Sequence, residues 1–163
     1  MALASLALVV QFTLPRPNRE QRLVARVLSV LHRSRATSAV ASIARRRFTA
    51  RCRILAAGKE LVVTSDGARL LVDATRVKPL AGSRRPAAIR AHAYLAGCPR
   101  LLGRMLRRRL LRGRPVYVGH RGAGYELLLA DAPAVVVLVV SPTFTPVEIR
   151  YRAGRTRGSS RLH

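Results

Sequence analysis

The sequence predicts an α+β fold in which a small antiparallel sheet packs on a basic amphipathic helix, with a basic helical arm at the N-terminus. Three observations support it. Residues 99–112 begin with proline and are followed by Gly113, which are the start and stop signals of a helix. Asp66-Gly67 separates two apolar runs, a strong hairpin signal. Ala134–Val140 reads AVVVLVV, a short β-branched run typical of a buried strand.

These features divide the chain into three parts. Residues 1–53 are expected to form a basic arm, helical or partly disordered, and residues 54–151 a small α+β domain. Residues 152–163 are rich in Arg, Gly and Ser, which predicts a disordered basic tail. A hydrophobic content of 49% excludes disorder of the whole chain.

The first residues, Met1–Leu14, are apolar but give no clear targeting signal. The run is too short to span a bilayer and lacks the positively charged start of a secretory signal peptide. Residues 18–50 are expected to be helical, because Leu23, Val27 and Leu31 recur at helical spacing with Arg between them. The Ser- and Ala-rich stretch 34–42 weakens this pattern.

The strands of the predicted sheet come from two regions, 54–72 and 116–151. The first holds the Asp66-Gly67 hairpin. The second holds a hairpin around Gly119–Gly124 and two further strands, at 134–140 and 147–151. Gly119–Gly124 lacks the spacing of a phosphate-binding loop, so a glycine-rich turn is the preferred interpretation. Gly82–Pro86 is expected to be a basic turn.

The helix at 99–112 is amphipathic. Its apolar side is expected to carry Leu101, Leu102, Met105, Leu106 and Leu110, and its other side is rich in Arg. Arg109 is placed at the edge of the apolar stripe, where its aliphatic stem can lie along the stripe.

Charge gives the clearest indication of a partner. The chain has 31 Lys or Arg, all but two of them Arg, against seven acidic residues, so its formal net charge is +24. Such a charge favours polyanions, with nucleic acid first and an acidic membrane surface second. The expected phosphate contacts are Arg100, Arg104, Arg107, Arg108 and Arg114, with Arg45, Arg46 and Arg47 as an auxiliary patch. The Arg bias is also what a GC-rich or overlapping reading frame produces.

Catalysis, metal binding and a cofactor are not expected. The seven carboxylates include no close pair for acid–base chemistry, and no nucleophile motif is present. Cys52 and Cys98 lack zinc-site spacing and are too few for a disulfide framework, which favours a reducing compartment.

Residues 98–130 carry a family resemblance. Cys98-Pro99-Arg100-Leu101-Leu102, the Arg-Leu helix and Arg-Gly-Arg-Pro-Val-Tyr-Val-Gly-His at 112–120 resemble the adenovirus U exon proteins. The likeness covers roughly residues 54–140, although in that family the corresponding piece lies near the N-terminus. It implies a small viral early protein of the host nucleus, found at DNA replication centres and connected with the single-stranded-DNA-binding protein.

The functional hypothesis is therefore a non-catalytic basic nuclear accessory protein that binds nucleic acid or joins a nucleoprotein assembly. Two alternatives remain open. One is a mitochondrial ribosomal or RNA-binding protein, because the acid-poor N-terminal region has a transit-peptide composition. The other is a membrane-surface protein anchored by the helix at 99–112. The oligomeric state is not indicated.

Overall fold

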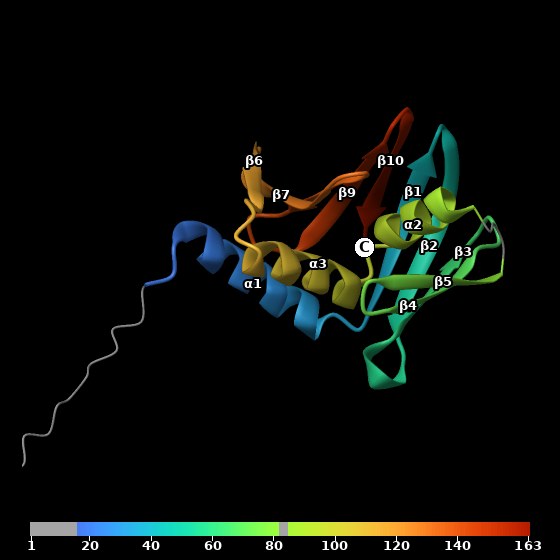
Figure 1. Cartoon of the computed structure of the whole chain (residues 1–163), viewed down its shortest axis with the longest axis horizontal. Helices are drawn as coiled ribbons and strands as arrows, with labels where there is room; N and C mark the ends of the chain where they lie inside the picture. The colour runs from blue at the N-terminus through green and yellow to red at the C-terminus, as the bar shows by residue number, and fades with distance from the viewer. Residues whose placement is uncertain (1–15, 82–84) are drawn as a thin grey trace, which may run out of the picture.

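A computed structural model describes residues 16–81 and 85–163 (Figure 1). Within these ranges the chain forms three α-helices, one short 3-10 helix and ten strands. In chain order they are α1 (Arg19–Arg33), β1 (Ala36–Ile43), β2 (Arg46–Ile54), η1 (Ala56–Gly58), β3 (Glu60–Thr64), β4 (Arg69–Asp73), β5 (Arg76–Ala81), α2 (Pro86–Leu95), α3 (Pro99–Leu111), β6 (Tyr117–Arg121), β7 (Gly124–Asp131), β8 (Val135–Val140), β9 (Pro146–Ala153) and β10 (Thr156–Leu162).

All ten strands belong to one antiparallel sheet in the order β5-β4-β3-β2-β1-β10-β9-β8-β7-β6. The sheet consists of two five-stranded meanders, β1–β5 and β6–β10, which α2 and α3 connect in the chain. The meanders are joined where β1 pairs with β10, with Ala41 opposite Ser160. The first and last strands of the chain therefore form the middle of the sheet.

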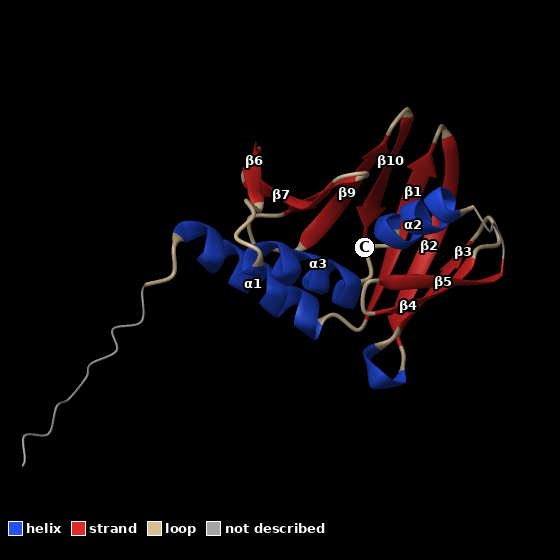
Figure 2. Cartoon of the chain, in the orientation of Figure 1, coloured by secondary structure: helices blue, strands red, loops and turns tan. Residues whose placement is uncertain are grey.

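The sheet curves around its helices. Helix α2 contacts both β5 and β9, although five strands lie between them in the sheet order. In a flat sheet those two strands would be roughly 29 Å apart, whereas a helix is only about 10 Å wide. Figure 2 shows the three α-helices on one side of the strands. The helices thus cover the concave side of the sheet, and the outward-pointing strand residues form its convex side.

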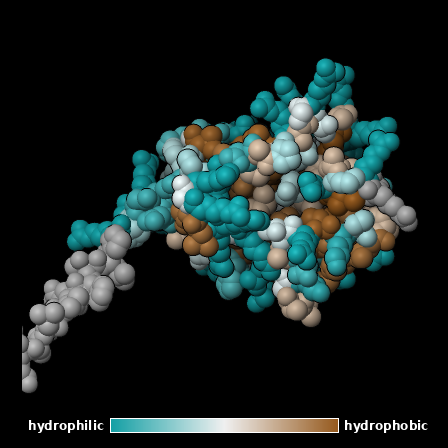
Figure 3. Space-filling view, viewed as in Figure 1, coloured by the Kyte–Doolittle hydropathy of each residue, from teal (hydrophilic) through white to brown (hydrophobic). Residues whose placement is uncertain are grey.

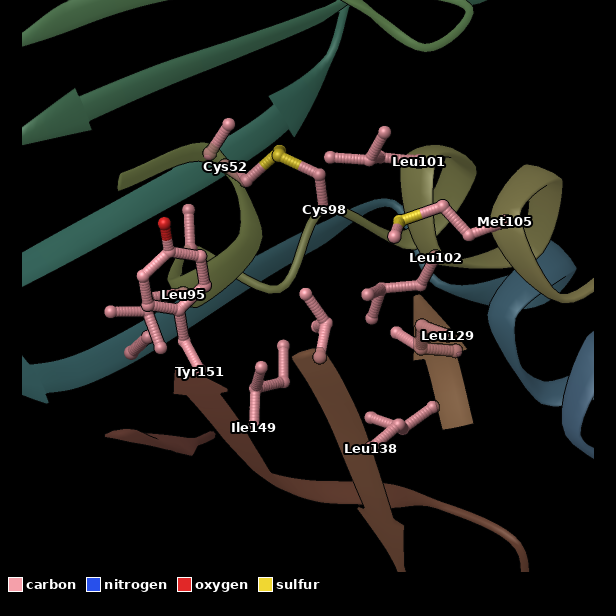
Figure 4. Close-up of a cluster of buried hydrophobic side chains, with 14 of the residues drawn as sticks. Cys52, Leu95, Cys98, Leu101, Leu102, Met105, Leu129, Leu138, Ile149 and Tyr151 are labelled. Carbon is pink, nitrogen blue, oxygen red and sulfur yellow. A yellow bond between two sulfur atoms is a disulfide. The ribbon is translucent and has the colours of Figure 1, made fainter. Parts of the chain in front are cut away.

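An aliphatic core lies between helices and sheet. Helix α1 contributes Leu23, Val24, Val27 and Leu31 to this core, and α3, which contacts α1, contributes buried residues such as Leu102. Figure 4 shows side chains of α3, β7, β8 and β9 meeting beside a disulfide between Cys52 of β2 and Cys98. The two cysteines are buried, so the bond fastens the start of α3 to the sheet from inside the core.

The expected α+β class with an antiparallel sheet is confirmed, but the sheet is not small. Residues 36–53, predicted as part of a helical or partly disordered arm, lie in β1, β2 and the turn between them, so the helix of the first region ends at Arg33. Helix α1 is not an arm, because its apolar face packs against α3. Small residues explain the error in β1: Ala39 and Ala41 face the core, and alanine has little preference for strands.

The predicted disordered tail is also corrected, because residues 156–162 form β10 at the centre of the sheet. Its inward positions include Gly158 and Ser160. A Cβ atom on Gly158 would lie 2.9 Å from Leu95 Cδ1. The polar, glycine-containing sequence is therefore what allows α2 to approach this strand closely.

Several local predictions are confirmed. The Asp66-Gly67 hairpin joins β3 to β4, and the helix at 99–112 is α3. The runs at 134–140 and 147–151 are β8 and β9. The glycine-rich segment 119–124 spans the β6–β7 hairpin, with Gly122 and Ala123 at its turn. A Cβ atom on Gly124 would lie 2.3 Å from the backbone oxygen of Val140, so glycine is required there for strand packing.

No helix in the described part of the chain is long and apolar enough to cross a membrane. The apolar run Met1–Leu14 and most of the predicted turn at Gly82–Pro86 lie outside the described residues.

Candidate binding site: a cationic groove with an aromatic wall

An open groove of about 520 Å³ lies at one end of the molecule. The N-terminal half of α1 forms one wall, and β6, β7 and the turn between β8 and β9 form the other. Figure 1 shows these elements close together at the end where the described chain begins. The groove is lined by Arg19, Glu20, Arg22, Leu23, Arg26, Tyr117, Tyr125 and Phe144.

Helix α1 presents three guanidinium groups to the groove. Asn18 caps the helix: its side chain accepts the backbone N–H of Gln21 at 2.7 Å, and the Gln21 side chain accepts the N–H of Asn18 at 2.9 Å. The cap fixes where the helix starts and hence its rotation. Arg19, Arg22 and Arg26 are spaced by three and four residues, so they share one helical face.

Glu20 holds the two walls together. Its Oε1 accepts the backbone N–H groups of Val116 at 2.6 Å and Tyr117 at 2.8 Å, which joins the start of α1 to the start of β6. Both bonds end on the same carboxylate oxygen. Glu20 therefore acts as a structural clamp in the groove, and its one negative charge offsets only part of the positive charge of the three Arg.

The opposite wall is aromatic. The rings of Tyr125 and Phe144 are stacked with centroids 5.8 Å apart, and His120 lies 5.3 Å from Tyr125 and 5.7 Å from Tyr117. The guanidinium carbon of Arg26 lies 5.1 Å from the Phe144 ring centre, a cation–π contact across the groove. These contacts order the wall before any ligand arrives.

The groove is electropositive. Among the described residues, Arg19, Arg22 and Arg26 form no salt bridge; Arg22 donates only to the backbone oxygen of Pro17, at 3.2 Å. Figure 3 shows hydrophilic side chains spread over the face in view, with hydrophobic patches between them. The groove thus combines uncompensated cations with an apolar surface, a pairing suited to an amphipathic anion.

The Arg residues predicted on α3 do not form one surface. Arg100, Arg104 and Arg107 line a small pocket against α1, whereas Arg108 and Arg114 line another pocket towards β7. Arg114 is paired with Asp131 at 3.4 Å. The five predicted phosphate contacts are thus divided between two sides of α3. One of them, Arg114, lies after the end of the helix and is already paired with a carboxylate.

Arg109 differs from its predicted position at the edge of the apolar stripe. It is buried, donates to the backbone oxygen of Pro115 and reaches Asp131 at 3.2 Å. The hydrogen bond from Arg109, together with the charges of Arg109 and Arg114, lowers the pKa of Asp131, although desolvation opposes this shift. The Arg109 side chain therefore has a structural role in the fold.

The auxiliary patch lies elsewhere. Arg45 occupies the turn between β1 and β2 in a left-handed backbone conformation, and Arg46 and Arg47 begin β2. Figure 1 places this turn at the opposite end of the molecule from the groove. Arg47 is next to Ser42 and Ser159 on the convex side of the sheet. The structure does not bring residues 45–47 together with the α3 cations.

Buried groups capable of holding a metal gather at one place. The ligand atoms of Cys52, Cys98 and Glu60 all lie within 4.8 Å of one another. The two sulfurs are bonded to each other and Glu60 accepts the backbone N–H groups of Arg100 and Leu101, so these atoms are occupied within the protein. The expectation of reduced cysteines is wrong.

Sequence reasoning missed the groove because its walls are far apart in the chain. Arg19, Arg22 and Arg26 were visible as the polar side of a helix, but nothing local predicted which strands would face them. Phe144 lies in the turn between β8 and β9, with a backbone φ of +64°. The chain has few aromatic residues, so a phenylalanine in a turn was the one local sign that this loop could form an apolar contact or a binding surface.

Known proteins similar to this chain are found among solved structures. No protein-family model matches the chain, and no curated protein does. Among solved structures, MucB is similar with a TM-score of 0.47 and 15% identity, covering 88% of this chain and 58% of that one. MucB in complex with MucA(peri) is similar with a TM-score of 0.37 and 13% identity, covering 87% and 54%. The chain therefore spans little more than half of either.

These findings correct the sequence-based identity and function. The two solved structures described above are MucB and MucB in complex with MucA(peri), and neither is an adenovirus protein. The resemblance to U exon proteins, the viral nuclear role, the mitochondrial alternative and the nucleic-acid partner are withdrawn. The Cys52–Cys98 disulfide is independent physical evidence in the same direction, because the nucleus keeps protein thiols reduced.

Proposed function

We propose that this protein is a non-catalytic binding protein that holds an anionic amphiphile in the α1 groove. The ligand class is a phosphate or carboxylate head on an apolar chain or ring. The single observation that supports it most is the pairing of three Arg without salt bridges on one wall with stacked aromatic rings on the other.

The charge on α1 sets the head group. Guanidinium groups bind carboxylate and phosphate through short, charge-assisted hydrogen bonds. Arg19 and Arg22 are exposed and uncompensated, and the neighbouring carboxylate of Glu20 is held by two backbone N–H groups. A cationic ligand would meet repulsion here, whereas an anionic head would meet donors that need no rearrangement of ion pairs.

The aromatic wall sets the rest of the ligand. Tyr125 and Phe144 offer a continuous apolar surface that a bare inorganic anion would leave in contact with water. A volume of about 520 Å³ is within the usual range of roughly 300–1,000 Å³ for small-molecule sites. A head bound by α1 and an apolar body lying on the rings would use both walls.

A binding role fits the side chains better than catalysis does. The lining residues hold no nucleophile next to a general base, and Glu20 has no free role as an acid or base. The buried disulfide favours action in an oxidising compartment, because such bonds persist outside the reducing cytosol.

Isothermal titration with dodecyl phosphate, below its micelle concentration and at about 150 mM salt to screen surface charge, tests the proposal. We expect saturable binding at one site per chain. R22Q and F144A should each weaken it by about tenfold to a hundredfold, because each removes interactions worth roughly 1.5–3 kcal/mol. Arg33→Gln is the matched control: Arg33 lies in the last turn of α1, away from the groove, and its substitution should change affinity less than about twofold.

Two further ligands separate the contributions of head and body. Dodecyltrimethylammonium keeps the chain but reverses the charge, and inorganic phosphate keeps only the head. Neither should compete with dodecyl phosphate for the groove. Equal affinity for the cationic and anionic detergents, or equal effects of R22Q and R33Q, would overturn the proposal.

A further inference from the structure

A second cationic pocket lies between α1 and α3. It has a volume of about 160 Å³, and the C-terminal half of α1 contributes Leu28, Leu31 and His32 to its lining. Arg100, Arg104 and Arg107 of α3 line its other side. The groove uses the first half of α1 and this pocket the second half, so the two sites share no lining residue.

The three Arg side chains lie on one face of α3, because their spacing of four and three residues corresponds to successive turns. Arg100 Nη1 is 3.2 Å from His32 Nδ1, and Arg104 Nη2 donates to the backbone oxygen of Gly58 at 3.4 Å. Arg107 is exposed and has no salt bridge to any described residue. The cluster therefore holds three positive charges on neighbouring turns.

The nearest carboxylate does not neutralise the cluster. Glu60 is fully buried, and its oxygens accept the backbone N–H groups of Arg100 at 2.6 Å and Leu101 at 2.9 Å. Its single negative charge faces the guanidinium groups of Arg100 and Arg104 at most. The pocket consequently keeps an excess of positive charge.

Two donors in this cluster are without partners. Arg100 Nε and Arg104 Nη1 are shielded from solvent and have no hydrogen-bond acceptor among the described residues. A buried donor left unsatisfied costs about 1–3 kcal/mol, and more when it is charged. An anion in the pocket would offset the charge repulsion, and a rotation of the Arg100 and Arg104 side chains towards it would give both donors an acceptor.

We infer that this pocket binds a small oxyanion of the phosphate or sulfate type. The volume suits a compact anion and excludes a nucleotide or an alkyl chain. Arg100 and Arg104 would bind the anion from the side of the interface between α1 and α3 (the α1–α3 seam). Arg107 would contact the anion from the solvent side. The anion would also fasten α1 to α3, the only helix pair among the described elements with an extensive mutual contact.

The test uses the full chain and inorganic phosphate, with sodium chloride at equal ionic strength as the reference. Phosphate should raise the melting temperature above the chloride reference and titrate as one site by calorimetry. Arg107→Gln should reduce phosphate affinity about fivefold to tenfold, consistent with one charge-assisted contact. Since Arg107 is exposed and without a salt bridge, this variant should fold normally.

Arg108→Gln is the matched control on the next residue of the same helix, pointing to another pocket. It should leave phosphate affinity within about twofold, as expected for a solvated charge. Phe144→Ala should also leave it unchanged, and R107Q should leave dodecyl phosphate binding unchanged, which separates this site from the groove. Phosphate effects equal to those of chloride, or equal losses in R107Q and R108Q, would refute the inference.

Discussion

Reduction of the Cys52–Cys98 disulfide should lower the melting temperature by roughly 10 °C. The bond closes a loop with a sequence separation of 46 residues. The chain-entropy model gives about 4 kcal/mol for a loop of this length, and each kcal/mol moves the midpoint of a chain of this size by about 2–4 °C. Scanning calorimetry with and without reductant measures the effect directly.

The control is the double variant C52A/C98A. It should melt near the reduced wild type and show no response to reductant, because it has no bond to lose. A wild-type midpoint that is unchanged by reductant, with thiol labelling proving that the cysteines are free, would contradict the stabilising role. It would also remove the support for an oxidising compartment.

Replacement of Glu60 by alanine should destabilise the protein by about 3 kcal/mol, since two buried N–H groups at the start of α3 would lose their acceptor. Arg100 and Arg104 would also lose the carboxylate that lies beside them. Urea unfolding of Glu60→Ala against wild type gives the free energy. Asp73→Ala is the control, because Asp73 is exposed and makes only a long salt bridge of 3.8 Å to Lys59.

Glu60→Gln adds a pH signature. Burial raises the pKa of Glu60 above its usual 4.5, against the lowering effect of the two N–H bonds and the nearby guanidinium charges. A raised pKa contributes stability that is present below the unfolded-state pKa and lost as pH rises through the folded-state pKa. The cost of Glu60→Gln should therefore be larger near pH 4 than at pH 7. A cost that grows with pH instead would mean that the carboxylate is ionised more easily in the fold.

The sequence predicted elements whose signals are local. Helix α3 has proline at its start and Gly113 just after its end, and the β3–β4 turn has Asp66-Gly67. The Asp66 prediction was incomplete: its carboxylate accepts a hydrogen bond from Thr64 and contacts His92 at 2.8 Å. Burial opposes these bonds, but together they lower the pKa of Asp66. The turn is thus tied to α2, a contact that no local pattern indicates.

The missed strands are those whose inward residues are small or polar. In β2 an alternation was available, since Phe48, Ala50 and Cys52 face the core while Thr49 and Arg51 between them point outward. The run of Arg at 45–47 favoured the prediction of a basic arm over this strand-like alternation of inward and outward residues. In β10 there was little to find, because Gly158 and Ser160 carry almost no apolar signal, and their role depends on α2 lying against them. Tertiary packing decided these segments over composition.

The excess of Arg also has a different meaning in the fold. Part of it is structural, as with buried Arg109, which pairs with Asp131, and with Arg150 of β9, which pairs with Glu126 of β7 and with Glu148 of its own strand. Part is left uncompensated on α1 and at the α1–α3 seam. The sequence-based prediction placed the phosphate contacts on and just after α3, with an auxiliary patch at Arg45–Arg47, whereas the two proposed anion sites both depend on α1.

The most direct test of the proposed function is to locate the ligand. A dodecyl phosphate carrying a photoreactive diazirine at the end of its alkyl chain can be crosslinked to the wild-type protein, and the labelled peptides identified by mass spectrometry. We expect labelling at Tyr117, Tyr125 and Phe144, suppressed by excess dodecyl phosphate but not by inorganic phosphate. Labelling concentrated on the convex side of the sheet, around Arg47 and Arg157, would contradict a ligand site in the α1 groove.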